Sequence, residues 1–316
     1  MKALIKTICV QRSLKFKLTF MAVFIVTLIF QALANGLVFA ADNNDAQEPA
    51  QFTVTLKGQG KPVILIPGLM SDQRVWHALS AELSSKYQLH LINLAGFADT
   101  PAITEPSLHA AKQQLLAYIE ENQLDKPIVI GHSLGGFMAF WLASSAPDSI
   151  GAVISVDGLP FIGPIFTQSN ESTVESLAAQ AMQIKGMYQA MTQQQLSMQG
   201  RYGLSRQATS TEAQNAVMTM IEHSDPATVG QALYTLLSND LRQDIANIKA
   251  PTLLLGASGG FDDLAQHAAA ERLYQGQLVA LPSAKLKMNT QSRHFIMFDD
   301  PQWLNKQVIA FLEASL

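Results

Sequence analysis

Two hydrophobic patterns alternate along the chain after residue 50. Short apolar or alternating runs predict strands, and they cover residues 52–56, 63–66, 89–94, 127–130, 150–156, 252–255 and 286–288. Apolar residues that recur with helical spacing predict helices, and these cover residues 74–83, 108–119, 135–146 and 302–312. Strands separated by helices of this length predict an α/β fold, in which a mostly parallel, twisted sheet carries helices on both faces. Such sheets bind their ligands outside the carboxyl ends of the strands.

Residues 158–240 interrupt this alternation. They contain no strand pattern and are rich in glutamine and methionine, with six of the twelve methionines of the chain. Methionines usually fill gaps in a core, and this interpretation covers most of the six. The position of the segment between two predicted strands favours a helical lid, inserted at about residues 158–240 over a site at the top of the sheet. The lid would belong to a single domain that spans residues 51–316.

The first forty residues follow a different pattern. Five basic residues and no acidic residue precede an apolar run at residues 18–30, and small-residue sites then end at Ala34 and Ala40. This order is typical of a secretory signal peptide. Residues 1–40 are therefore predicted to direct export to the periplasm or the medium, with cleavage after one of the two alanines. The alternative is an uncleaved membrane anchor at residues 18–39, since about 20 residues are enough to span a bilayer.

Composition excludes several classes of protein. With 48% hydrophobic and 15% charged residues, the chain is not expected to be disordered. The single cysteine, Cys9, excludes a disulfide scaffold. Without residues 1–40 the chain keeps 16 basic residues against 25 acidic ones, a net charge of −9, which gives no reason to expect a nucleic-acid partner. No histidines and acids have the spacing of a metal site, so neither a metal nor a cofactor is predicted.

The strongest chemical signal is the segment Gly131-His132-Ser133-Leu134-Gly135. It follows a predicted strand and opens a predicted helix, which is the context that a nucleophile elbow requires. A sharp turn there exposes the Ser133 side chain, and side chains two positions before and after it would clash, so both positions are glycine. The start of the helix also directs backbone N–H groups toward the same point. The segment predicts that Ser133 is a nucleophile.

With this motif the chain resembles the α/β-hydrolase superfamily, from about residue 51 to residue 316. The segment VILIPGL at 63–69 is similar to the loop that supplies half of the oxyanion hole, although many members have His-Gly where this chain has Pro67-Gly68. The segment at 293–295, Arg-His-Phe, is followed by Asp300-Pro301 and is similar to the catalytic-histidine segment of the family. The order, with the nucleophile first and the histidine last, also matches the family.

The resemblance implies a role for each of these residues. Ser133 is expected to be the nucleophile, and His294 the general base that takes the hydroxyl proton. The backbone N–H groups of Leu69 and Leu134 are expected to form the oxyanion hole.

Two positions compete for the acid that orients His294. In many relatives the acid lies three residues past the glycine that ends the strand at 252–255, and in this chain that position is Gly259. Asp263 or its neighbour Asp262 could serve only if the loop is longer here. Some members carry the acid after the preceding strand, which corresponds to Asp157. We expect Asp157 to be the acid because it directly ends a strand beside the elbow, with Asp263 as the alternative.

These features predict an exported, carboxylesterase-like serine hydrolase. It would cleave an ester or a related acyl compound through an acyl-enzyme on Ser133. The expected partner is a small-molecule acyl substrate, with membrane contact only if the N-terminal segment is retained, and the oligomeric state is left open. Fold does not fix substrate, so a thioesterase, a lactonase and a cofactor-free haloperoxidase are alternatives. A non-catalytic binding protein that retains the fold is another, supported only by the irregular acid loop.

Overall fold

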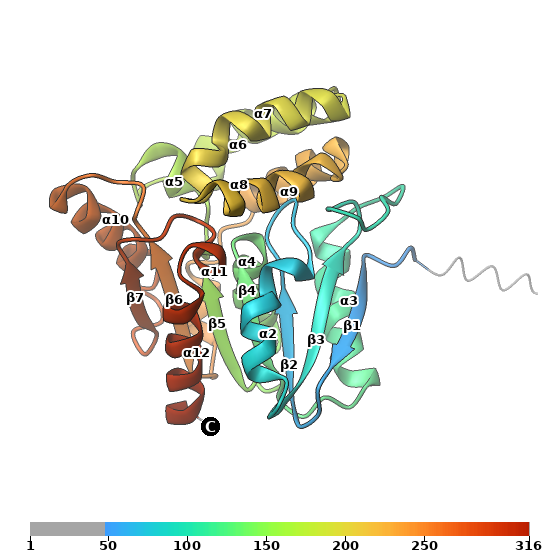
Figure 1. The fold of residues 1–316 in the computed structure, drawn as a ribbon, viewed down its shortest axis with the longest axis vertical. Helices are drawn as coiled ribbons and strands as arrows, with labels where there is room; N and C mark the ends of the chain where they lie inside the picture. Colours follow the sequence, from blue (N-terminus) through green and yellow to red (C-terminus); the bar gives the residue numbers. More distant parts are fainter. Residues whose placement is uncertain (1–47, 316) are drawn as a thin grey trace, which may run out of the picture. The chain divides into compact units, whose positions relative to one another are not determined.

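A seven-stranded sheet with the order β1-β3-β2-β4-β5-β6-β7 forms the centre of the molecule (Figure 1). The computed structural model describes residues 48–315, so the predicted signal peptide at 1–40 lies outside the described residues. β1 runs antiparallel to β3, and every other pair in the sheet is parallel. The strands are β1 (Phe52–Lys57), β2 (Lys61–Ile66), β3 (Tyr87–Leu94), β4 (Ile128–His132), β5 (Ala152–Val156), β6 (Thr252–Ala257) and β7 (Lys285–Asn289).

The burial of each strand explains its hydrophobic pattern. β4 and β5 are buried at every position, and β2 is buried over its last four residues. Because helices cover both faces of the sheet, these central strands consist of runs of apolar residues. β1 and β7 lie at the two edges, and there buried or half-buried positions mostly alternate with exposed ones. The mostly parallel sheet predicted from these patterns is confirmed.

Helices cover both faces of the sheet, as predicted. α2 (His77–Leu83) and α12 (Pro301–Ser315) pack together on one face, and α3 (Leu108–Glu121) and α4 (Leu134–Ser145) pack together on the other (Figure 1). In α4 every residue except Ser145 is buried, which is why its sequence is apolar on all sides. No helix within residues 48–315 has both the length and the apolar character needed to cross a membrane.

One long helix was not predicted from the sequence. α10 (Leu264–Gln277) connects β6 to β7, and only Tyr274 and Gln277 are buried along it. Two buried residues give too weak a periodic pattern to predict a helix. The Asp263 side chain accepts a hydrogen bond from the Gln266 backbone N–H and so caps this helix. Two short 3-10 helices and one short α-helix were also not predicted as separate elements: η1 (Gln73–Trp76), η2 (Asp244–Asn247) and α11 (Ile296–Asp299).

Five helices fill the segment between β5 and β6, above the carboxyl ends of the strands (Figure 1). α6 packs against α9 and α7 against α8. α6 and α7 expose most of their residues, and each begins with a reciprocal capping box that satisfies the backbone N–H groups of its first turn. The five helices are α5 (Gly163–Thr167), α6 (Val174–Gln189), α7 (Gln193–Gln207), α8 (Thr211–Glu222) and α9 (Pro226–Ser238).

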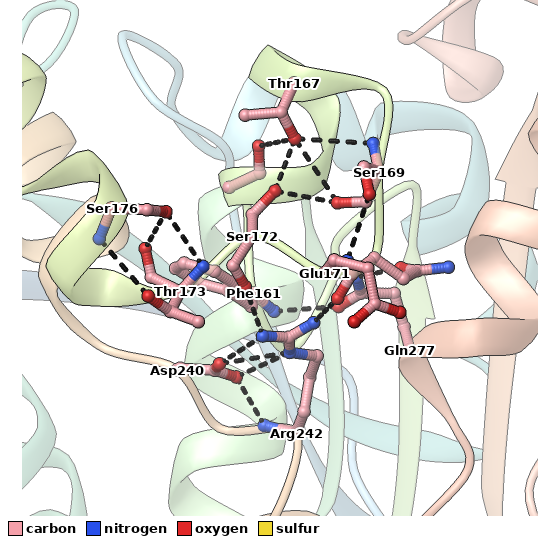
Figure 2. Close-up of polar contacts among 12 residues, drawn as sticks. Phe161, Thr167, Ser169, Glu171, Ser172, Thr173, Ser176, Asp240, Arg242 and Gln277 are labelled. Carbon is pink, nitrogen blue, oxygen red and sulfur yellow. Dashed lines mark hydrogen bonds and ion pairs between the residues drawn. The ribbon is translucent and has the colours of Figure 1, made fainter.

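A polar cluster around Arg242 ties this helical segment to the rest of the domain (Figure 2). The Arg242 guanidinium pairs with Asp240 and donates to the carbonyl oxygens of Asn170 and Ser172. Its charged group lies 4.9 Å from the centre of the Phe161 ring. The cluster therefore joins the loop between α5 and α6 to the chain that follows α9.

Candidate active site

Ser133 lies at a sharp turn between β4 and α4. Its φ of 52° and ψ of −115° are a backbone conformation that residues other than glycine rarely adopt. A Cβ atom at Gly131 would lie 1.9 Å from the Gly135 carbonyl oxygen, and one at Gly135 would lie 2.1 Å from the Ile66 carbonyl oxygen. The turn therefore requires glycine on both sides of Ser133, for the steric reason given by the sequence pattern.

The loop after β2 lies against this turn. A Cβ atom at Gly68 would lie 2.7 Å from His132 Nδ1 and 3.2 Å from Ser133 Cβ, so only glycine fits there. Leu69 follows in the loop and lines the same cavity as Ser133. Leu134 is the first residue of α4, where a backbone N–H has no carbonyl partner inside the helix. Of the two predicted oxyanion-hole residues, Leu69 thus lines one cavity and Leu134 a second, and Ser133 lines both.

His294 and Asp157 are paired. The distance between His294 Nδ1 and Asp157 Oδ2 is 2.6 Å, and the two side chains are 28% and 7% exposed. Because a carboxylate only accepts hydrogen bonds, Nδ1 carries the hydrogen and Nε2 is left as a proton acceptor. Asp157 ends β5 with a φ of 52°, and its backbone N–H donates to the Leu255 carbonyl at 2.7 Å. The strand ladder therefore fixes the carboxylate beside the elbow.

Asp263 and Gly259 lie in the loop after β6, where many relatives carry the acid. A Cβ atom at Gly259 would lie 2.4 Å from the backbone of Gln291, which leaves no space for a side chain. The Asp263 carboxylate caps α10 and is exposed. Of the two candidate acids, the structure brings Asp157 to His294 and places Asp263 elsewhere.

His132 supports the backbone of His294. Its side chain is fully buried, and its Nε2 donates to the His294 carbonyl oxygen at 3.1 Å. The centres of the two rings are 4.7 Å apart. Burial, and in second place the charge of His294, hold the pKa of His132 well below its usual value. His132 is therefore neutral and acts as a packing residue beside the elbow, in agreement with its position in the motif.

Two cavities meet at Ser133, His294 and Gln207. The first has a volume of about 260 Å³ and is lined by polar side chains such as Tyr188 and Gln199, together with apolar ones. The second has a volume of about 330 Å³, and its apolar lining is Leu134, Phe137, Leu159, Ile162, Ile165, Phe166 and Leu236. Cavities of this size accommodate small molecules. Within residues 48–315, no group of three or more histidine, cysteine or acidic side chains is arranged to hold a metal ion.

Comparison with known proteins gives the family. A family model described as the alpha/beta hydrolase fold matches residues 61–301. The chain belongs to the α/β-hydrolase family. It is 25% identical over 256 residues to the pimeloyl-[acyl-carrier protein] methyl ester esterase of Vibrio vulnificus, which covers 81% of this chain and 95% of that protein. The enzyme of the same name from Pectobacterium carotovorum is 26% identical over 267 residues, which cover 80% and 94% of the two chains.

Solved structures share the fold of this α/β hydrolase. The enol-lactonase from Burkholderia xenovorans superimposes with a TM-score of 0.66 and 19% identity, over 83% of this chain and 96% of the other. A thermophilic esterase from Thermogutta terrifontis gives a TM-score of 0.68 and 18% identity, over 84% and 93% of the two chains. Family membership and the esterase relatives identify the protein as a carboxylesterase-like hydrolase.

Two residues near the site of this α/β hydrolase were not found from the sequence. Tyr274 donates a hydrogen bond to Asp157, but it lies in α10, which the hydrophobic pattern did not predict. Gln207 lines both cavities from the last position of α7. In the sequence, only its position in the predicted lid pointed to it. Gln207 is many residues away from both Ser133 and His294, so no local pattern links it to them.

Proposed function

We propose that this α/β hydrolase is an exported serine esterase whose nucleophile is Ser133, with His294 as the base and Asp157 as the acid. The observation that supports this assignment best is the 2.6 Å contact between Asp157 and His294, beside cavities that Ser133 and His294 line together. A serine hydroxyl is a weak nucleophile until an oriented base takes its proton, and this arrangement supplies the orientation.

In the proposed reaction, Ser133 Oγ attacks the ester carbonyl carbon while His294 Nε2 takes the hydroxyl proton. The negative oxygen that forms accepts hydrogen bonds from the backbone N–H groups of Leu69 and Leu134, each of which is expected to contribute about 2.7–4 kcal/mol. The imidazolium then gives its proton to the departing alcohol, and an acyl-enzyme remains. Water, deprotonated by the same nitrogen, attacks the acyl carbon, and the imidazolium returns its proton to Ser133 Oγ as the acyl bond breaks and the acid leaves. Asp157 stays ionised and stabilises the imidazolium in both halves.

The side chains that line the two cavities favour an uncharged substrate. Among the described residues that line them there is no lysine, arginine or glutamate, and the aspartate, Asp157, is already paired with His294. The apolar cavity beside α5 fits a hydrocarbon group. The cavity beside α7 offers Tyr188 and Gln199, whose side chains are hydrogen-bonded to each other at 3.0 Å. We expect one arm of the ester to be a hydrocarbon and the other to be small and weakly polar.

Reaction with a fluorophosphonate probe tests the nucleophile. We expect the wild-type protein to be labelled and to hydrolyse a panel of uncharged short- and medium-chain esters. The Ser133→Ala variant should lose labelling and nearly all turnover, because only oxyanion and binding effects remain. Ser258→Ala is the matched control, since Ser258 Oγ also contacts a histidine, His267 Nδ1, at 2.8 Å. Labelling that survives in Ser133→Ala, or a wild-type protein that is never labelled, would contradict the proposal.

Export is supported by the order of basic, apolar and small residues at 1–40. Mass spectrometry of the protein from its native host should show a new N-terminus after Ala34 or Ala40. Recovery of the chain from the membrane fraction with Met1 retained would favour the anchor instead.

A further inference from the structure

Tyr274 reaches Asp157 from α10. Its hydroxyl donates to Asp157 Oδ1 at 2.7 Å, while His294 contacts the other carboxylate oxygen. The Ala257 backbone N–H donates to the same Oδ1 at 2.8 Å. The carboxylate therefore receives three hydrogen bonds, from three different elements: β6, α10 and the loop that carries His294.

The sequence of β6 provides the space for the tyrosine ring. A Cβ atom at Gly256 would lie 2.7 Å from Tyr274 Cε1 and 2.5 Å from Met288 Sδ. Any larger residue at position 256 would therefore displace the ring or Met288. Tyr274 is only 6% exposed, and its ring lies over Gly256 with its hydroxyl directed at Asp157. Both the glycine and the helix are thus arranged around this hydrogen bond.

The hydroxyl is a permanent donor. Burial, followed by the negative charge of Asp157, raises the pKa of Tyr274 well above its usual value. Tyr274 therefore stays protonated over the whole range in which an esterase works. The titratable groups around the carboxylate are His294, Tyr274 itself and, beyond the His294 ring, the neutral His132.

We propose that Tyr274 is a positioning residue for the hydrolytic reaction, which holds the Asp157 carboxylate in line with His294 and shares its negative charge. The proposal rests on the proposed roles of Ser133, His294 and Asp157. In this chain the acid follows β5, and the loop after β6 has no space for a side chain at Gly259. Tyr274 and the Ala257 N–H thus hold the acid from the strand and the helix on either side of that loop.

The Tyr274→Phe variant tests this role, because it keeps the ring over Gly256 and removes only the hydroxyl. Hydrogen bonds to charged groups are stronger than neutral ones, so we expect kcat/KM to fall about tenfold, mainly through kcat. Without the hydroxyl, more of the carboxylate charge acts on His294 and stabilises its protonated form. The acidic limb of the pH profile of kcat/KM should therefore move to higher pH.

Tyr118→Phe is the matched control. It also removes a tyrosine hydroxyl that contacts a histidine, His90 Nδ1 at 2.8 Å, but it lies in α3, away from the cavities. This variant should keep both kcat/KM and the acidic limb. Gly256→Ala is a second test, since the added methyl group pushes against the tyrosine ring. It should shift the limb in the same direction as Tyr274→Phe.

The outcomes separate this proposal from the proposed function. If wild-type protein reacts with the fluorophosphonate probe and Tyr274→Phe keeps its kcat/KM and its acidic limb, Tyr274 has no positioning role. A loss of activity with an unmoved limb and a lowered melting temperature would mean that the residue only stabilises the fold, which also overturns the proposal. If the wild-type protein itself neither reacts with the probe nor hydrolyses esters, the proposed function fails first.

Discussion

The elbow and the inserted helices differ in how tightly the chain is constrained. At the elbow, β4 and nearly all of α4 are buried, and a single methyl group at Gly131 or Gly135 would clash with backbone atoms. In α6 and α7 only Leu177, Ala181 and Leu196 are buried, and Tyr202 is 89% exposed. The comparison indicates that Ser133, the proposed nucleophile, is held by a tightly packed part of the fold. α6 and α7 line part of the first cavity, but they contribute only Gln207 to the second.

The connection between α7 and α8, in the middle of the insertion, departs from this division. The Phe295 N–H donates to the Gln207 carbonyl at 2.9 Å, so the chain next to His294 is bonded to the end of α7. Asp299 Oδ1 accepts from the Thr209 N–H at 2.8 Å and from its hydroxyl at 2.7 Å, while Oδ2 accepts from the Arg293 N–H at 2.8 Å. The segment at 207–209 therefore supports the chain next to His294, whereas most other residues of α6 and α7 are exposed.

The largest effect is expected from replacing Asp157, the proposed acid, which lies beside the tightly packed elbow. Asp157→Asn keeps the shape but favours the wrong His294 tautomer, so turnover should fall by about 10⁴ with little change in melting temperature. Asp263→Asn and Asp262→Asn should be nearly normal, because Asp263 caps α10 and contacts neither His294 nor Ser133. Steady-state ester hydrolysis by the three variants makes the comparison. If Asp263→Asn loses most of its turnover while Asp157→Asn stays active, the assignment of Asp157 as the acid is wrong.

Hydrogen exchange measures the difference in constraint directly. Amides in α6 and in α7 before residue 200 should exchange about a hundredfold or more faster than those of β4, because exposed helices open locally while a central strand opens only with the whole domain. An acyl phosphonate bound to Ser133 should slow exchange in these helices, since lids commonly close over bound ligands. Equal protection in both regions, unaffected by the ligand, would remove the case for a mobile lid.

A moderate effect is expected from breaking the contact between Asp299 and the segment at 207–209, which joins the inserted helices to the chain around His294. Asp299→Asn replaces one acceptor oxygen by an amide group, so the bond to Thr209 and the bond to the Arg293 N–H cannot both be kept. A typical hydrogen bond contributes about 0.5–1.5 kcal/mol, which predicts a fall in kcat/KM of about two- to tenfold. The adjacent Asp300→Asn, which can still cap α12 through Trp303, is the control. Equal kinetics for the two variants would show that the junction does not position His294.

The smallest effect is expected at the outer contact between the regions. Asp99, in the loop after β3, pairs with His223 at the end of α8 and with Arg74 of η1. The hydrogen bond from His223, and secondarily the charge of Arg74, lower the pKa of Asp99. A pKa lowered in the folded state stabilises the protein above the unfolded pKa, and this stabilisation is lost as the pH falls through the folded pKa.

Asp99→Asn should therefore lower the melting temperature slightly at neutral pH and by progressively less in acid. The carboxylate is largely exposed, and exposed ion pairs are screened and contribute under about 1 kcal/mol. The shift should not exceed about 2–4 °C, and added salt should reduce it. Calorimetry at several pH values measures the melting temperatures of the wild-type protein and the variant. A difference between them that grows toward acid pH would contradict this account.

Much of the fold and the elbow was predictable because their causes are local in the sequence. A run of apolar residues in β4, followed by glycines around Ser133, predicts a buried strand and a tight turn from neighbouring atoms alone. The order of strands and helices followed from the same patterns. α10 was missed because its side chains bury little apolar surface, and periodicity reports only burial.

The contacts of Asp157 with His294 and Tyr274 depended on the tertiary structure. Asp157 and His294 are separated by 137 positions in the chain, and Asp157 and Tyr274 by 117. From the sequence alone, Asp157 and Asp263 were both candidates, and Asp157 was favoured only because it directly ends a predicted strand beside the elbow. The pairing of β5 with β6, the close approach of Gln291 to Gly259 and the docking of Tyr274 on Gly256 bring these groups together. Hydrogen bonds between such distant residues exist only after the sheet has formed, which is why composition and spacing cannot specify them.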